Sequence, residues 1–169
     1  MKPAPIDDLK KELLQLSPKR VLDLLLKLGR FKKENKELLT YLLFEQENES
    51  GYTESIKLEI DELLASMKGL PSGLSKKLLR KIPRLINKQN KYMASKSSAI
   101  ELHLHFARKL QELEASHYGK LSPEKMFLQQ IIKAERLLSF LTNDLRHDYE
   151  KQVASLQKNK IHIQIRVKK

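Results

Sequence analysis

The sequence predicts an all-α fold, and three observations support this prediction. Apolar residues recur mainly at intervals of three and four, which is the spacing of one face of an α-helix. Only 5 of the 169 residues are glycine and 6 are proline, whereas the many turns of a sheet protein consume both. Two Ser-Pro pairs, at residues 17–18 and 122–123, match a helix start, with serine as the cap and proline in the first turn. We expect an irregular antiparallel bundle of about six or seven helices, with helical-repeat-like stacking as the alternative.

The expected helices follow the apolar periodicity along the chain. The second is apolar on most sides and ends at Gly29, so we expect it to be central. Pro83 lies inside the fifth, where it predicts a kink or a restart near Ile82. The expected ranges are 6–16, 18–28, 31–45, 52–68, 74–93, 95–115 and a long last helix over 122–156.

We expect a single helical domain over residues 1–158, followed by a basic C-terminal tail, residues 159–169. The strongest break is the Gly-Leu-Pro-Ser-Gly segment at 69–73, which indicates a tight connection or a boundary between two halves. In the tail, Ile161, Ile163, Ile165 and Val167 alternate with polar residues, which is a strand pattern. An isolated strand is not stable, so this segment is a mobile tail, pairs with a second copy, or orders on a partner.

The net charge of +12 is concentrated in two segments. Residues 69–100 carry eight basic and no acidic side chains, and residues 158–169 carry five and none. Such blocks attract phosphate backbones, acidic partners or anionic surfaces without distinguishing among them. The candidate binding residues are Lys76, Lys77, Arg80, Lys81, Arg84, Lys88 and Lys91 in the basic helix, and Arg166, Lys168 and Lys169 in the tail.

The basic helix has two interpretations. In the functional interpretation, the cations recur at spacings of three and four, so they share one face of the helix, and this face binds a phosphate backbone or an acidic protein. As a structural feature, it is a solvated face, or it pairs with the acidic helix that bears Glu54, Glu59, Asp61 and Glu62. Only one aromatic residue, Tyr92, lies near this face, which gives bases little to stack on.

The sequence gives little support for an enzyme. It has no cysteine, so disulfides and thiolate zinc sites are excluded, and it lacks glycine-rich phosphate loops and a nucleophile elbow. Glu101 and His105 are four apart, and Asp144 precedes His147 by three, which does not match the paired Glu-x-x-His pattern of di-metal bundles. His103 lies on an apolar face and is expected to be a partly buried structural histidine. We expect no catalytic residue, metal or cofactor.

One block resembles a known group of proteins. Residues 31–45, Phe-Lys-Lys-Glu-Asn-Lys-Glu-Leu-Leu-Thr-Tyr-Leu-Leu-Phe-Glu, resemble a block in small, uncharacterised all-helical bacterial proteins. The resemblance covers about the first 70 residues. It implies a compact helical fold with superhelical stacking like that of HEAT or armadillo repeats, and it transfers no functional residue.

The sequence therefore favours a non-enzymatic helical scaffold that contacts an acidic protein partner through the basic helix and the basic tail. The alternative is nucleic-acid binding without sequence preference through the same surfaces. No signal peptide or membrane-spanning stretch is expected, so a cytoplasmic location is the default, and the oligomeric state is left open.

Overall fold

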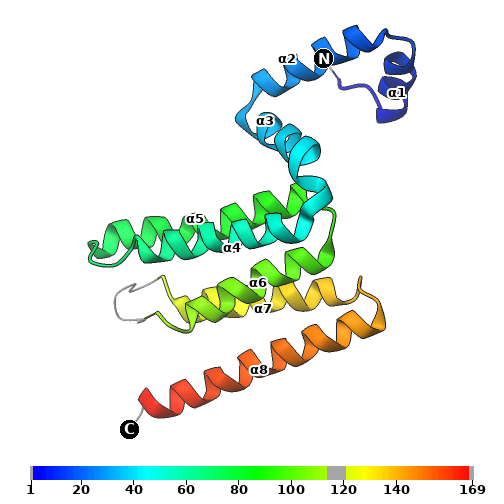
Figure 1. Ribbon diagram of the computed structural model, residues 1–169. Coiled ribbons are helices and arrows are strands. Elements are labelled where there is room, and N and C mark those ends of the chain that lie inside the picture. Colours follow the sequence, from blue (N-terminus) through cyan, green and yellow to red (C-terminus); the bar gives the residue numbers. More distant parts are fainter. Residues whose placement is uncertain (1, 114–120, 168–169) are drawn as a thin grey trace. The chain divides into compact units, whose positions relative to one another are not determined.

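The computed structural model describes residues 2–113 and 121–167, with side chains described as far as residue 158, and every regular element in these ranges is helical (Figure 1). The all-α prediction is confirmed. The chain divides into two compact units, Met1–Glu45 and Gln46–Lys169. The α-helices are α1 (Ile6–Leu14), α2 (Pro18–Phe31), α3 (Lys33–Thr40), α4 (Glu49–Ala65), α5 (Ser72–Tyr92), α6 (Lys96–Leu110), α7 (Pro123–Leu138) and α8 (Asn143–Val167). A π-helical turn, Tyr41–Glu45, and a 3-10 turn, Gln46–Asn48, lie between α3 and α4.

The first unit contains α1, α2 and α3 and has little core of its own. Tyr41 is its only buried residue among those described. The prediction that the second helix is central is wrong, since Leu25 and Leu28 of α2 are 43% and 55% exposed. Within this unit, α1 and α3 are too few to surround α2. Gly29 does not end α2 but lies inside it, where a Cβ atom would come 3.0 Å from Leu39 Cδ1, so glycine allows α2 and α3 to approach closely.

The second unit is built around α6, which packs against α4, α5, α7 and α8. Helices α4 and α5 form one antiparallel pair, α6 and α7 form the next, and α8 covers both members of the second pair (Figure 1). The core is apolar and includes Ile60, Ile86, Phe106 and Phe127, each at most 2% exposed. Because α6 contacts four neighbours, its side chains also provide most of the polar contacts that join them.

The break at residues 69–73 is a tight connection inside the second unit. Helix α4 ends at Ala65 and α5 begins at Ser72. Gly69 has a φ of +75°, a left-handed conformation that glycine adopts without steric cost. This residue allows the chain to reverse between the two antiparallel helices.

Helix α5 continues through Pro83 without a restart. Proline at this position removes one backbone hydrogen bond and crowds the preceding turn. The residues on both sides of it, Ile82, Leu85 and Ile86, are buried in the core. Their packing holds the helix together across the proline.

The end of the chain differs from the prediction in two ways. The long helix expected over 122–156 is two helices, with a turn at residues 139–142 that lets α7 and α8 both pack on α6. The strand pattern at residues 161–167 does not correspond to a strand in the structure, because α8 continues to Val167. Extending an existing helix adds a hydrogen bond for each residue, whereas a lone strand has no partner for its backbone.

Candidate functional site

The outer face of α5 carries the predicted basic residues. The opposite side of the helix is anchored in the core by Leu79, Ile82 and Ile86, which are fully buried. This orientation turns the cations outward. The α5 basic face is defined by seven residues, of which Lys77, Arg80, Lys81, Arg84 and Lys91 are exposed, and Lys76 and Lys88 are partly buried.

The acidic side chains of α4 make their contacts away from α5. Glu54 pairs with Lys57 on its own helix at 2.6 Å. Asp61 lies 2.8 Å from His105 Nε2 and 3.3 Å from Lys109 Nζ, both on α6. In the described part of the chain, the five exposed cations of the α5 basic face form no ion pair. The carboxylates of Glu54 and Asp61 therefore do not neutralise the α5 basic face, contrary to one of the two interpretations of the sequence.

The structure gives no contact between the predicted binding residues of the tail and the α5 basic face. Arg166 lies in α8, but its side chain is not among those described. Lys168 and Lys169 lie outside the described residues. Tyr92, the aromatic residue near the basic face, is partly buried.

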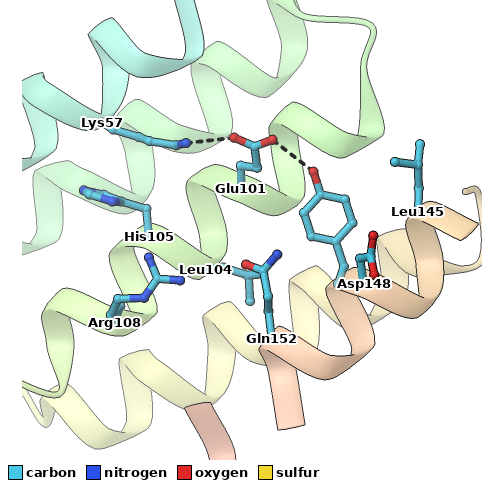
Figure 2. Close-up of a pocket in the computed structure, with 9 residues that line it drawn as sticks. Lys57, Glu101, Leu104, His105, Arg108, Leu145, Asp148 and Gln152 are labelled. Atoms are coloured by element: carbon cyan, nitrogen blue, oxygen red, sulfur yellow. Dashed lines mark hydrogen bonds and ion pairs between the residues drawn. The ribbon is translucent and has the colours of Figure 1, made fainter. Parts of the chain in front are cut away.

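Sequence reasoning missed a polar pocket of about 350 Å³ between α4, α6 and α8 (Figure 2). Glu101 of α6 is one of the residues that line it. Its Oε2 atom is 2.7 Å from Lys57 Nζ of α4, and its Oε1 atom accepts a 2.9 Å hydrogen bond from the Tyr149 hydroxyl of α8 (Figure 2). One carboxylate thus joins three helices. Because these residues are 44 and 48 positions from Glu101, no local pattern signals the cluster.

The surroundings of this carboxylate shift the pKa values of both its partners. Burial lowers the pKa of Lys57, but the hydrogen bonds and charges of Glu101 and Glu54 outweigh this effect, so the pKa is raised. Burial together with the hydrogen bond to Glu101 raises the pKa of Tyr149 to about 12. Near neutral pH the tyrosine is therefore a neutral donor and the lysine is a cation.

The acid and histidine pairs that the sequence singled out are used in other ways. Glu101 binds Lys57 and Tyr149, while His105 binds Asp61, so the two do not converge on one point. Among the described residues, no three histidine, aspartate or glutamate side chains come together as metal ligands.

His103, which the sequence predicts to be partly buried, is almost completely buried in the structure. It is 3% exposed, its Nδ1 atom lies 2.9 Å from Gln130 Oε1 and its Nε2 atom lies 3.2 Å from Asn90 Nδ2. Burial, with a smaller contribution from the nearby charge of Lys133, lowers its pKa to about 4, although the hydrogen bond to Gln130 acts in the opposite direction. The ring is therefore neutral near pH 7. A neutral ring carries one proton, and its two partners show where it lies. Gln130 Oε1 is an acceptor and Asn90 Nδ2 is a donor, so Nδ1 carries the proton and donates to Gln130, while Nε2 accepts from Asn90.

The fold and these sites define an all-α protein whose second unit carries a basic helix face and a polar cluster that joins three helices. A scan against protein-family models finds no match, and neither do searches of curated proteins and of solved structures. The resemblance of residues 31–45 to small helical bacterial proteins therefore assigns no family. Within the described residues, no helix is long and apolar enough to cross a membrane.

Proposed function

We propose that this chain is a non-enzymatic helical scaffold of the cytoplasm that binds an acidic protein partner through the α5 basic face. The basic C-terminal segment serves as a second contact. The second unit acts as a rigid support, because α5 is held by buried apolar side chains along its inner side. The helix is then a preformed cationic surface that needs no rearrangement to bind.

One observation carries the proposal. The exposed cations of α5 have no ion-pair partner in the described part of the chain, although the neighbouring α4 is rich in carboxylates. Like charges held close together without partners repel one another and weaken the folded state. An acidic partner removes this repulsion and gains Coulombic attraction at the same time. The electrostatic energy of the α5 basic face is thus more favourable in a complex with an acidic partner than in the free chain.

Two features favour a protein over a nucleic acid as the partner. The α5 basic face offers no exposed aromatic ring on which bases stack. The first unit exposes large apolar side chains, among them Leu14, Phe31 and Leu43, which are 70–75% exposed. Exposed apolar surface of this kind is typical of protein-interaction sites. Binding to a nucleic-acid backbone is the alternative, because it uses the same cations.

A direct comparison of two probes tests the proposal. We would titrate the full-length chain into a labelled poly-glutamate peptide and a labelled DNA duplex of equal charge, at about 50–200 mM salt. Tighter binding of the peptide at every salt concentration is the expected result. Tighter binding of the duplex, with an affinity that falls by orders of magnitude over this range, would favour the nucleic-acid alternative. If neither probe binds at about 50 mM salt, both proposals fail.

A further inference from the structure

A second pocket, of about 270 Å³, lies where the end of α5, the start of α6 and the last turns of α7 meet. Asn90 of α5, His103 of α6 and Leu137 of α7 contribute to its walls. The pocket is slightly smaller than the roughly 300–1,000 Å³ of typical small-molecule sites. It therefore suits a compact ligand or the anionic group of a small molecule.

The charged side chains that line this pocket are all cationic. They are Lys96 at the start of α6 and Lys133 and Arg136 on α7, and no aspartate or glutamate is among the described residues that line it. Two of these cations are held in place. Lys133 Nζ donates a 3.0 Å hydrogen bond to Asn87 Oδ1, and Lys96 Nζ lies 5.9 Å from the centre of the Phe140 ring. Arg136 forms no ion pair among the described residues, so its planar donors are available.

The backbone adds to this positive potential. Ser95, the N-cap of α6, also lines the pocket, and its side chain accepts from Ser98 N at 3.2 Å. The pocket thus lies at the amino end of a 15-residue helix, where the helix dipole places partial positive charge. Cations from two helices and a helix terminus therefore converge on one small cavity.

We propose that the pocket between α5, α6 and α7 binds the phosphate group of a small molecule, with Lys96, Lys133 and Arg136 as its ligands. A phosphate monoester carries about −1.5 to −2 charges near neutral pH and three acceptor oxygens, which matches three cationic side chains. A carboxylate carries one charge and two oxygens and leaves part of this set unpaired. The arginine fork provides two parallel donors to the phosphate, and the lysines add charge.

This site does not depend on the proposed function. None of the residues of the α5 basic face lines the pocket. Its ligand is a small molecule, whereas the basic face binds a macromolecule. The two proposals can therefore fail separately.

The test is a calorimetric titration of the full-length chain with inorganic phosphate and with glycerol 3-phosphate, at constant ionic strength. We compare the wild type with Lys96→Gln and Arg136→Gln, two exposed positions where the change is compatible with folding. The matched control is Lys125→Gln, an exposed cation of α7 that does not line the pocket. Amide shifts of Asn90 and Ser97 in NMR spectra report where the anion binds.

We expect one site per chain, with shifts at Asn90 and Ser97. Each pocket variant should weaken binding about tenfold, the effect of losing one hydrogen bond between charged groups, and the control should leave it unchanged. Tighter binding of glycerol 3-phosphate identifies a phosphate monoester as the ligand, and tighter binding of inorganic phosphate identifies the free ion. The proposal is overturned if binding does not saturate by about 10 mM or if the pocket variants bind like the wild type. Shifts confined to α5 cations would also overturn it, while leaving the proposed function intact.

Discussion

At the scale of single residues, His103 shows how the surroundings of a side chain, with burial as the largest contribution, set its ionisation state. The ring is enclosed by α5, α6 and α7, and both of its nitrogen atoms have amide partners. Protonation would place a charge in the core close to the cation of Lys133. The folded chain therefore holds the pKa near 4, about 2.5 units below that of an exposed histidine.

This shift predicts a loss of stability in mild acid. Because the pKa is lower in the folded than in the unfolded chain, the unfolded chain binds the proton more readily between about pH 6.5 and pH 4. Between pH 7 and pH 5, His103 should lower the free energy of unfolding by about 2 kcal/mol. Urea unfolding of the wild type and of His103→Gln measures this effect. The variant should be less stable at pH 7 but should lose about 2 kcal/mol less on going to pH 5, and equal losses would contradict the assignment.

Tyr149 predicts a second effect at this scale. Its hydroxyl donates to Glu101, and the residue is 9% exposed. Tyr149→Phe retains the packing of the ring but removes the donor, so the free energy of unfolding should fall by about 1 kcal/mol. Denaturant unfolding at pH 7 measures the change. A variant as stable as the wild type would show that the hydrogen bond contributes nothing in solution.

At the scale of helices, the sequence predicts starts better than ends. Ser17 and Ser122 cap α2 and α7 as predicted, since their side chains accept from Arg20 N and Lys125 N. A cap is a local contact over three residues, and local chemistry can be inferred from local sequence. The turn at residues 139–142 depends on α8 packing back onto α6, which is a contact between distant segments. For the same reason the two pockets, whose walls come from three helices each, could not be predicted.

The cap of α7 gives a prediction at the helix scale. Ser122 Oγ accepts from Lys125 N at 3.2 Å, and removing this contact leaves a helix amide without its cap. Ser122→Ala should lower the free energy of unfolding by about 1 kcal/mol. Ser155→Ala, an exposed position inside α8, is the control and should be neutral or slightly stabilising because alanine favours helix. Equal effects of the two substitutions in thermal unfolding would contradict the role of Ser122.

At the scale of the whole molecule, the charge of +12 is less important than its placement. The sequence identified the basic helix, because its cations and the absence of nearby acids are local features. It could not show which acids pair with which bases, since Asp61 and Glu101 find their partners across helices. Among the described residues, the five exposed cations of α5 have no such partners. The excess positive charge of the sequence is therefore located on a defined surface, the α5 basic face.

Two variants of equal net charge distinguish the contribution of the α5 basic face to binding from that of the overall charge of the chain. The α5 triple replaces three exposed residues of the α5 basic face with glutamate, at Lys77, Lys81 and Arg84. The control triple replaces three exposed lysines outside α5 and outside the basic C-terminal segment with glutamate, at Lys19, Lys125 and Lys151. Each triple lowers the net charge by six, so general electrostatic attraction weakens equally in both.

The most direct test measures the affinity of both triples and of the wild type for the labelled poly-glutamate peptide, at about 100 mM salt. The α5 triple should bind about tenfold or more weakly than the control triple, because the peptide loses its contacts with the helix as well as the general attraction. Circular dichroism should show the same helix content in all three chains. If both triples lose affinity to the same extent while remaining folded, the α5 basic face is not the binding surface.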